Sequence, residues 1–192
     1  MFKALKGLLV AAGDFMETFL FFSAILVVFY FFFAIPHEVV GDSMLPNFVN
    51  GEHLLTNKIL YSVKEPQRGD VVTFKFPKAP QFDYIKRIVG LPEEQIMLKD
   101  NKIYIYNKEN PEGFVLNETY LPEGTITAGK SFLPEGKKVL IPKNNYITFG
   151  DNRSRSSDSR EWGFVPRRNL IGKAWVRYWP PKELGLIKNP TY

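Results

Sequence analysis

The longest apolar stretch of the chain lies near its N-terminus. The run from Phe19 to Ile35 reads FLFFSAILVVFYFFFAI and contains no charged residue and no proline. Counted from Met16 the stretch has 20 residues, and a helix of that length spans about 30 Å, which matches the apolar core of a bilayer. Pro36 follows at once and is expected to end the helix, because proline lacks an amide N–H and clashes with the preceding turn. We therefore predict a transmembrane helix over residues 16–35.

This apolar stretch also fits two other interpretations, a cleaved signal peptide and a buried core helix. The run is longer than the apolar region of a cleavable signal peptide. No later segment is apolar enough to form a second span. We therefore favour a single membrane span over both alternatives.

From His37 onward the pattern changes to short β-branched and aromatic runs separated by turn residues, which is typical of strands. The predicted strands are His53–Lys58, Asp70–Lys75, Tyr84–Gly90, Gln95–Leu98, Lys102–Tyr106, Asn145–Phe149 and Ala174–Trp179. Asp100-Asn101 predicts a tight hairpin turn between two of them, because both residues tolerate positive φ. The segment Glu109–Gly136 is rich in Glu, Gly, Pro and Thr, and we expect a long surface excursion with room for one hairpin.

No helical periodicity of useful length follows the apolar stretch. The predicted fold class is therefore mainly β: an antiparallel, partly closed β-domain preceded by one N-terminal transmembrane helix.

Charge gives the membrane span a direction. Lys3 and Lys6 precede the span, and no Lys or Arg follows it until Lys58. The positive-inside rule then places the N-terminus in the cytoplasm. We predict a cytoplasmic N-terminus over residues 1–15, a cell-membrane anchor over 16–35 and an extracytoplasmic catalytic β-domain over 36–192.

The composition limits the kinds of binding partner and the kinds of catalytic or metal chemistry that the chain can have. The net charge is +5, and the basic residues are scattered rather than gathered in a stripe, so we expect membrane phospholipid rather than nucleic acid as a partner. The chain has no cysteine, which excludes disulfides, cysteine-based zinc sites and a thiol nucleophile. Its only histidines are His37 and His53, too few for a histidine-rich metal site. We expect no cofactor and no metal.

The first polar feature with candidate chemistry is Ser43, in the segment Val39–Pro46. It lies eight residues past Ile35, so an extended chain can carry it at most about 28 Å from the end of the span. Gly41 before it and Pro46 after it favour a backbone held open for the close approach of another chain. The segment by itself fits an ordinary turn serine better than a catalytic one.

The second feature is Lys86 in the predicted strand Tyr84–Gly90. Alternate residues of a strand share a face, so Lys86 lies between Tyr84 and Ile88, while Arg87 points to the opposite side. Apolar neighbours would desolvate the ammonium group and lower its pKa, as a lysine base requires. An acid is expected to meet Arg87. An edge-strand lysine that reaches solvent would show the same pattern.

The third feature is the loop Gly150–Arg160, in which eleven residues hold four serines, two aspartates and three arginines. The aromatic strand Asn145–Phe149 leads into it and Trp162–Pro166 leads out. A solvated polar loop is one interpretation. A polar loop held between buried segments more often forms a functional hydrogen-bonding cluster.

Four motifs of the chain occur in a specific order. They are Ser-Met-x-Pro from residue 43, Arg-Gly-Asp-Val-Val-Thr-Phe from residue 68, Tyr-Ile-Lys-Arg-x-x-Gly-x-Pro from residue 84 and Gly-Asp-Asn-Arg-x-x-Ser-x-Asp-Ser-Arg from residue 150. Each motif alone is unspecific. Together, behind an apolar span, they resemble the type I signal peptidase family from the anchor to about Pro180.

The resemblance implies a membrane-bound serine endopeptidase that removes signal peptides from exported preproteins. Ser43 would be the nucleophile and Lys86 the general base, a variant of the Ser-His-Asp arrangement. By motif position Ser156 would orient Lys86, and the backbone N–H of Ser43 would stabilise the oxyanion. An ion-pair framework would hold the loop, formed by Asp151, Asp158 and Arg160 with Arg87 as a partner.

The resemblance also implies where the substrate lies. An extended peptide would run between Pro36–Asp42 and Asp83–Ile85, with small side chains entering tight pockets. The residues expected to contact it are Asp42, Met44, Asp83, Tyr84 and Ile85.

The sequence departs from the family pattern in a few places. Some members carry a serine two residues before the nucleophile that completes the oxyanion site, whereas this chain has Gly41 there, which leaves the second donor unassigned. Asn47 stands where threonine is usual. Glu93-Glu94 replaces the common Gly-Asp.

Three alternatives carry different sequence requirements. A self-cleaving Ser/Lys repressor would need an N-terminal DNA-binding domain and an internal cleavage site, whereas an apolar span occupies that place. An inactive membrane-anchored binding module would be favoured if Ser43 or Lys86 were missing. A histidine-dependent serine protease could use only His37 or His53.

Overall fold

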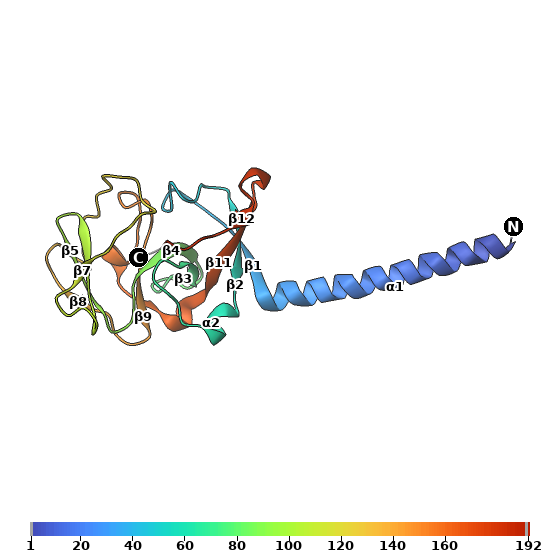
Figure 1. The fold of residues 1–192 in the computed structure, drawn as a ribbon, viewed down its shortest axis with the longest axis horizontal. Coiled ribbons are helices and arrows are strands. Elements are labelled where there is room, and N and C mark those ends of the chain that lie inside the picture. Colours follow the sequence, from blue (N-terminus) through green and yellow to red (C-terminus); the bar gives the residue numbers. More distant parts are fainter. Residues whose placement is uncertain (1, 191) are drawn as a thin grey trace.

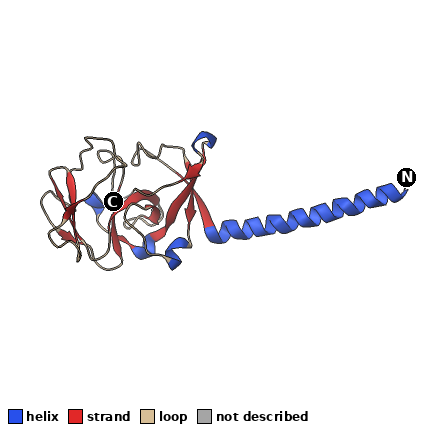
Figure 2. Cartoon of the chain, viewed as in Figure 1, coloured by secondary structure: helices blue, strands red, loops and turns tan. Residues whose placement is uncertain are grey.

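The computed structural model describes residues 2–190 and 192, which form one long helix and a β-domain (Figures 1 and 2). Helix α1 covers Phe2–Phe33 and extends away from the β-domain in Figure 1. Its segment Leu9–Val28 is long and apolar enough to cross a membrane, and none of it is buried against the rest of the protein. An apolar helix with no protein packed around it is consistent with a membrane anchor.

The end of α1 differs from the sequence prediction. The helix stops at Phe33 rather than at Ile35, and Ala34–Glu38 form strand β1, which pairs antiparallel with β2 (His53–Asn57). Pro36 lies inside β1. A proline is tolerated there because β1 is an edge strand with β2 as its one neighbour. No strand on the other side needs the N–H that proline lacks.

The main sheet is built on antiparallel pairs in the order β1-β2-β11-β3-β4-β9-β10, and β12 also pairs with β11. Its further strands are β3 (Val71–Lys75), β4 (Asp83–Gly90), β9 (Asn145–Phe149), β10 (Val165–Pro166), β11 (Leu170–Trp179) and β12 (Gly185–Leu186). Within the described chain, β1 and β10 are the edges of this ladder. The sheet is therefore open rather than closed.

A smaller sheet has the order β7-β6-β5-β8. Its strands are β5 (Gln95–Lys99), β6 (Lys102–Tyr106), β7 (Phe114–Val115) and β8 (Val139–Leu140). Asp100 and Asn101 connect β5 to β6 with φ values of 52° and 61°, which confirms the tight hairpin turn.

The mainly antiparallel β fold is confirmed, and the seven predicted strands correspond to β2, β3, β4, β5, β6, β9 and β11. The remaining strands, apart from β1, have only two residues each, too few to give an alternating pattern. The helical segments that follow β1 are short: α2 (Leu60–Val63), α3 (Ser159–Trp162) and the 3-10 turns Arg167–Asn169 and Pro181–Glu183.

The excursion Glu109–Gly136 contains β7, which forms a hairpin with β6. It is not confined to the surface, because Leu116 and Leu133 are buried in the core between β4, β5, β6 and β9. Apolar side chains spaced along an otherwise polar loop anchor it to the domain.

Two core clusters position the segments that carry Ser43 and Lys86. Met44 packs with Val39, Leu54 and other side chains in one cluster. Ile88 packs with aromatic residues in another. The segment that carries Ser43 and the strand that carries Lys86 are therefore both fixed by buried neighbours rather than by surface contacts.

Candidate active site

Ser43 lies in a tight turn that follows β1. The Leu45 N–H donates to the Asp42 carbonyl oxygen at 3.2 Å, and Gly41 adopts a φ of +85°, a conformation that favours glycine. Met44 is only 1% exposed, whereas Ser43 is partly exposed. The buried methionine holds the turn against the core and leaves the serine hydroxyl accessible.

Lys86 lies on β4 and meets this hydroxyl. Its side chain is 5% exposed. The Nζ atom donates to Ser43 Oγ at 2.7 Å and to the Ile85 carbonyl oxygen at 3.0 Å, and it lies 5.4 Å from the centre of the Tyr84 ring. A hydroxyl and an amine at this distance can exchange a proton directly.

Burial lowers the pKa of Lys86 from its ordinary value near 10.5 to about 8. The charges of Asp158 and Asp151 act in the opposite direction, but more weakly. Within the described chain Lys86 has no ion pair with a carboxylate. A substantial fraction of this lysine is therefore neutral in mildly alkaline solution, which is the form that accepts a proton.

Arg87 points to the other face of β4 and binds Asp151. Its Nε and Nη2 atoms donate to the two carboxylate oxygens at 2.9 and 2.7 Å, and Asn47 Nδ2 also donates to this carboxylate at 2.9 Å. Burial by itself lowers the pKa of Arg87, but the hydrogen bond and charge of Asp151 outweigh it and raise the pKa above its ordinary value. A bidentate pair of this kind is strong and geometrically specific.

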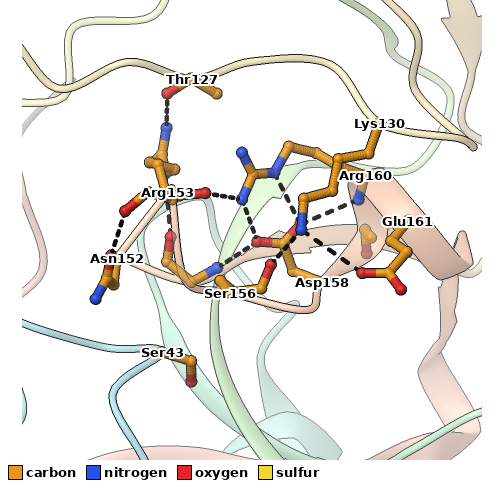
Figure 3. Close-up of polar contacts among 12 residues, drawn as sticks. Ser43, Thr127, Lys130, Asn152, Arg153, Ser156, Asp158, Arg160 and Glu161 are labelled. Atoms are coloured by element: carbon orange, nitrogen blue, oxygen red, sulfur yellow. Dashed lines mark hydrogen bonds and ion pairs between the residues drawn. The ribbon is translucent and has the colours of Figure 1, made fainter.

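A second buried ion pair lies inside the loop that follows β9 (Figure 3). Arg160 donates from Nε and Nη2 to the carboxylate of Asp158 at 2.9 and 2.8 Å. The Gly150 N–H donates to the same carboxylate at 3.1 Å. Burial raises the pKa of Asp158, but Arg160 and its hydrogen bonds lower it below the ordinary value overall. The carboxylate therefore stays ionised and ties the two ends of the loop together.

Ser156 lies in this loop with a side chain that is 1% exposed. Its Oγ atom makes no well-formed hydrogen bond within the described residues, although the hydroxyl is close enough to Asp158 to help lower the pKa of that carboxyl. Its carbonyl oxygen accepts a bond from Lys130 Nζ at 2.6 Å. The structure thus places Ser156 beside Asp158, without a direct hydrogen bond to Lys86.

An open cleft of about 460 Å³ lies beside the Ser43–Lys86 pair. Val39 and Val40 line one side, the start of β4 lines the other, and Ser157 also borders it. Of the residues predicted to contact a substrate, the cleft is lined by Met44, Asp83, Tyr84 and Ile85.

Asp42, also predicted to contact a substrate, is not among the cleft-lining residues. Its carbonyl oxygen accepts a hydrogen bond from Asn152 Nδ2 at 3.0 Å, and its carboxylate lies 3.5 Å from Arg155 Nη1. Asp42 thus joins the turn to the loop that follows β9.

Both histidines have other partners. His37 Nδ1 lies 3.1 Å from Thr56 Oγ1, and its Nε2 lies 3.6 Å from Asp83 Oδ2. The ring of His53 packs against the Tyr178 ring with centres 5.6 Å apart. Within the described chain neither histidine is hydrogen-bonded to Ser43, and the base adjacent to that hydroxyl is Lys86.

Several contacts around the site are not visible in the sequence. Asn152 binds the backbone on both sides of the Ser43 Cα, and Tyr120 covers the guanidinium of Arg87 at 4.1 Å. Arg153 pairs with Glu118, with Nη1 2.8 Å from Oε2. Asn152 and Arg153 belong to the motif that begins at Gly150, but the partners of all three contacts are far away in the sequence.

These features define a mainly antiparallel β-protein with an apolar N-terminal helix and a buried lysine bonded to an accessible serine in an open cleft. A family model described as "Signal peptidase, peptidase S26" matches residues 12–179. The chain belongs to this family of peptidases.

Two relatives in sequence agree with this assignment. The chain is 35% identical over 161 residues to a probable signal peptidase I-2 of Synechocystis sp. (strain ATCC 27184 / PCC 6803 / Kazusa), covering 81% of this chain and 68% of that protein. It is 32% identical over 164 residues to signal peptidase IB of Staphylococcus aureus (strain MRSA252), covering 83% and 85%. A crystal structure of a signal peptidase I from Enterococcus faecalis V583 has 27% sequence identity and a TM-score of 0.44, covering 58% of this chain and 97% of that one.

Proposed function

We propose that this protein is a membrane-bound serine endopeptidase that removes signal peptides from exported preproteins, with Ser43 as nucleophile and Lys86 as general base. The observation that carries the proposal is the 2.7 Å contact between Lys86 Nζ and Ser43 Oγ, made by a lysine whose burial lowers its pKa to about 8. Membership of a peptidase family supports the reaction class.

The chemistry follows from this pair. Neutral Lys86 accepts the proton of the Ser43 hydroxyl as Oγ attacks the scissile carbonyl carbon and the carbonyl oxygen becomes an oxyanion. The backbone N–H of Ser43 stabilises that oxyanion. When the C–N bond breaks, Lys86 returns the proton to the leaving amine. Water then attacks the acyl-enzyme with Lys86 again as the base, which restores Ser43.

The substrate binds as an added strand beside β4. On its β9 side, β4 is paired only from Arg87 to Gly90, so the backbone of Asp83–Lys86 has no strand partner there within the described chain. This free edge borders the cleft, and free strand edges bind extended peptides by backbone hydrogen bonds. We expect a small residue, Ala, Gly or Ser, immediately before the cleaved bond, because the side chains of Met44 and Ile85 line the cleft beside Ser43 and leave little volume there.

The membrane role rests on the apolar helix and the charge distribution. We propose that α1 from residue 16 to its end at Phe33 anchors the protein once in the cell membrane, in contact with phospholipid. Residues 1–15 then lie in the cytoplasm and the β-domain, which begins with β1 at Ala34, lies on the extracytoplasmic side. This arrangement brings the cleft to the surface where signal peptides emerge.

Cleavage of a preprotein by the full chain in detergent tests the catalytic proposal. We expect a single new N-terminus after a small residue, identified by mass spectrometry, and no product with Ser43→Ala. Product from Ser43→Ala equal to that from the wild type would contradict the assignment of the nucleophile. Cleavage of the protein itself with no cleavage of the preprotein would support a self-processing protease instead.

The topology has a separate test. Protease added outside sealed cells should degrade the β-domain and spare the first 15 residues, detected with a tag at either end. Protection of the β-domain would reverse the orientation.

A further inference from the structure

One residue, Asn152, joins the nucleophile turn to the loop that follows β9. Its backbone N–H donates to the carbonyl oxygen of Ser43 at 3.1 Å, and its side-chain Nδ2 donates to the carbonyl oxygen of Asp42 at 3.0 Å. The two segments are in close contact, since a Cβ added to Gly150 would lie 2.4 Å from the same Ser43 oxygen. Asn152 therefore binds the carbonyl groups on both sides of the Ser43 Cα.

The bond to Asp42 fixes the direction of the Ser43 N–H. The Asp42–Ser43 peptide is trans, and in a trans peptide the C=O and N–H point in opposite directions. Because the C=O is turned toward Asn152, the N–H is turned away from that loop. Within the described residues this N–H makes no hydrogen bond, so it is available to a bound group.

The carboxamide of Asn152 is itself held in one orientation. Its Oδ1 accepts hydrogen bonds from Ser154 Oγ at 3.1 Å and from the Arg155 N–H at 3.3 Å. With the oxygen occupied by its own loop, the NH₂ group is directed at Asp42. The loop thus acts as a rigid support for one peptide unit.

We propose that Asn152 is a positioning residue for the oxyanion site: its carboxamide holds the Asp42–Ser43 peptide so that the Ser43 N–H faces the oxygen of the scissile carbonyl. This inference rests on the proposed function. Gly41 has no side chain that could donate to the oxyanion. Stabilisation of the oxyanion therefore depends more strongly on the orientation of the Ser43 N–H. A donor fixed in advance stabilises developing charge without reorganisation during the reaction.

The competing explanation is that Asn152 only shapes its own loop. Two substitutions separate the roles. Asn152→Asp keeps an oxygen for Ser154 and Arg155 but removes the donor to Asp42, whereas Asn152→Ala removes both. A matched control is Arg155→Ala, which removes the exposed 3.5 Å ion pair between the same loop and the Asp42 carboxylate and leaves the carbonyl contact in place.

We expect both Asn152 variants to lower kcat by about ten- to a hundredfold, less than the loss of an oxyanion donor itself, with KM changed by less than about twofold. Rates are compared on the alkaline plateau, where Lys86 is neutral even beside a new carboxylate. Arg155→Ala should stay within about twofold of the wild type, because exposed ion pairs contribute little. A rise in KM with unchanged kcat, or an equal effect of Arg155→Ala, would overturn the proposal.

Inhibitor binding gives a second readout that loop stability alone would not change. A substrate-like peptide aldehyde adds Ser43 Oγ to its carbonyl carbon, the serine proton passes to Lys86, and the former carbonyl oxygen occupies the oxyanion position. The corresponding peptide alcohol forms no such bond. The ratio of aldehyde to alcohol affinity should fall in Asn152→Ala by about the same factor as kcat. An unchanged ratio in Asn152→Ala would refute the positioning role. If only Ser43→Ala loses aldehyde binding, the positioning role fails but the proposed function still stands.

Discussion

The two faces of β4 bury two neighbouring cations with opposite results. Lys86 is 5% exposed and bonds a hydroxyl and a carbonyl, and its pKa falls to about 8. Arg87 is 3% exposed and binds both oxygens of Asp151, and its pKa rises. Burial is nearly equal on the two faces. The carboxylate partner decides the direction in which the pKa of each cation shifts.

The carboxylates near Lys86 are held by arginines. Asp151 and Asp158 each raise the pKa of Lys86, but Asp151 is bound by Arg87 and Asp158 by Arg160. Each ion pair offsets most of the negative charge that would otherwise stabilise a protonated lysine. The two pairs therefore have a chemical consequence beyond holding the loop: they leave desolvation as the dominant influence on Lys86.

The largest expected effect is on the Lys86 face. Lys86→Met should lower kcat/KM by about a hundred- to ten-thousandfold, because the proposed general base is lost. The measurement is the rate of preprotein cleavage at the optimum pH of the wild type. Lys102→Met on the second sheet, which removes an exposed lysine, is the control and should retain full activity. Comparable rates for Lys86→Met and the wild type would exclude this lysine as the base.

On the Arg87 face the main effect should be on stability. Arg87→Met leaves the Asp151 carboxylate buried without a cation, and we expect a loss of about 3–5 kcal/mol in the free energy of unfolding. Chemical denaturation of the full chain in detergent measures it. The double variant Arg87→Met/Asp151→Asn should recover part of the loss, because no buried charge remains. No recovery would indicate that packing of the guanidinium, rather than charge, is what matters.

Removing Lys86 should have the opposite effect on stability. The unfolded chain holds the lysine proton up to about pH 10.5, whereas the folded protein releases it near pH 8. The wild type is therefore destabilised by about 3 kcal/mol below pH 8 and regains that stability as the pH rises through 8 to 10.5. Lys86→Met should unfold at higher denaturant concentration than the wild type at pH 7, with a difference that shrinks toward pH 10. If Lys86→Met is less stable than the wild type at pH 7, burial of the Lys86 ammonium group does not destabilise the folded protein.

The smallest of these effects is expected for Ser156. Ser156→Ala should reduce kcat/KM by about tenfold at most, since even a fully formed hydrogen bond is worth only about 1 kcal/mol and this hydroxyl lies beside Asp158 with no direct bond to Lys86. Steady-state kinetics at saturating and limiting preprotein separate kcat from KM. A loss as complete as that of Lys86→Met would instead make Ser156 an essential part of the catalytic pair.

Local patterns of the sequence are sufficient to predict the two faces of β4 and part of the fold. Alternation along Tyr84–Gly90 separates Lys86 from Arg87, and Asp100-Asn101 predicts the hairpin turn because those residues accept positive φ. The strand β1 is not predictable in this way. Its apolar residues Ala34 and Ile35 continue the helical run in the sequence, whereas in the structure they are extended and paired with β2.

Contacts between distant segments also lie beyond sequence reasoning. The carboxamide of Asn152 binds Asp42 across a separation of 110 residues, and Arg153 binds Glu118 across 35. Tertiary packing decides such partners, and no local periodicity encodes it. A motif shows that these residue types occur together, but the structure is needed to show which oxygen each donor reaches.

The pH dependence of kcat/KM tests the Ser43–Lys86 pair most directly. We predict that kcat/KM rises with pH along a limb centred near pH 8, because burial lowers the pKa of Lys86 to about 8. The rate should reach a plateau about one pH unit higher. His37→Ala and His53→Ala should leave the limb in place and the plateau rate within about twofold. A limb centred near 6.5, the ordinary pKa of histidine, that vanishes with either substitution would contradict a lysine base. A rate still climbing at about pH 10 would show a lysine with an unperturbed pKa and would contradict it equally.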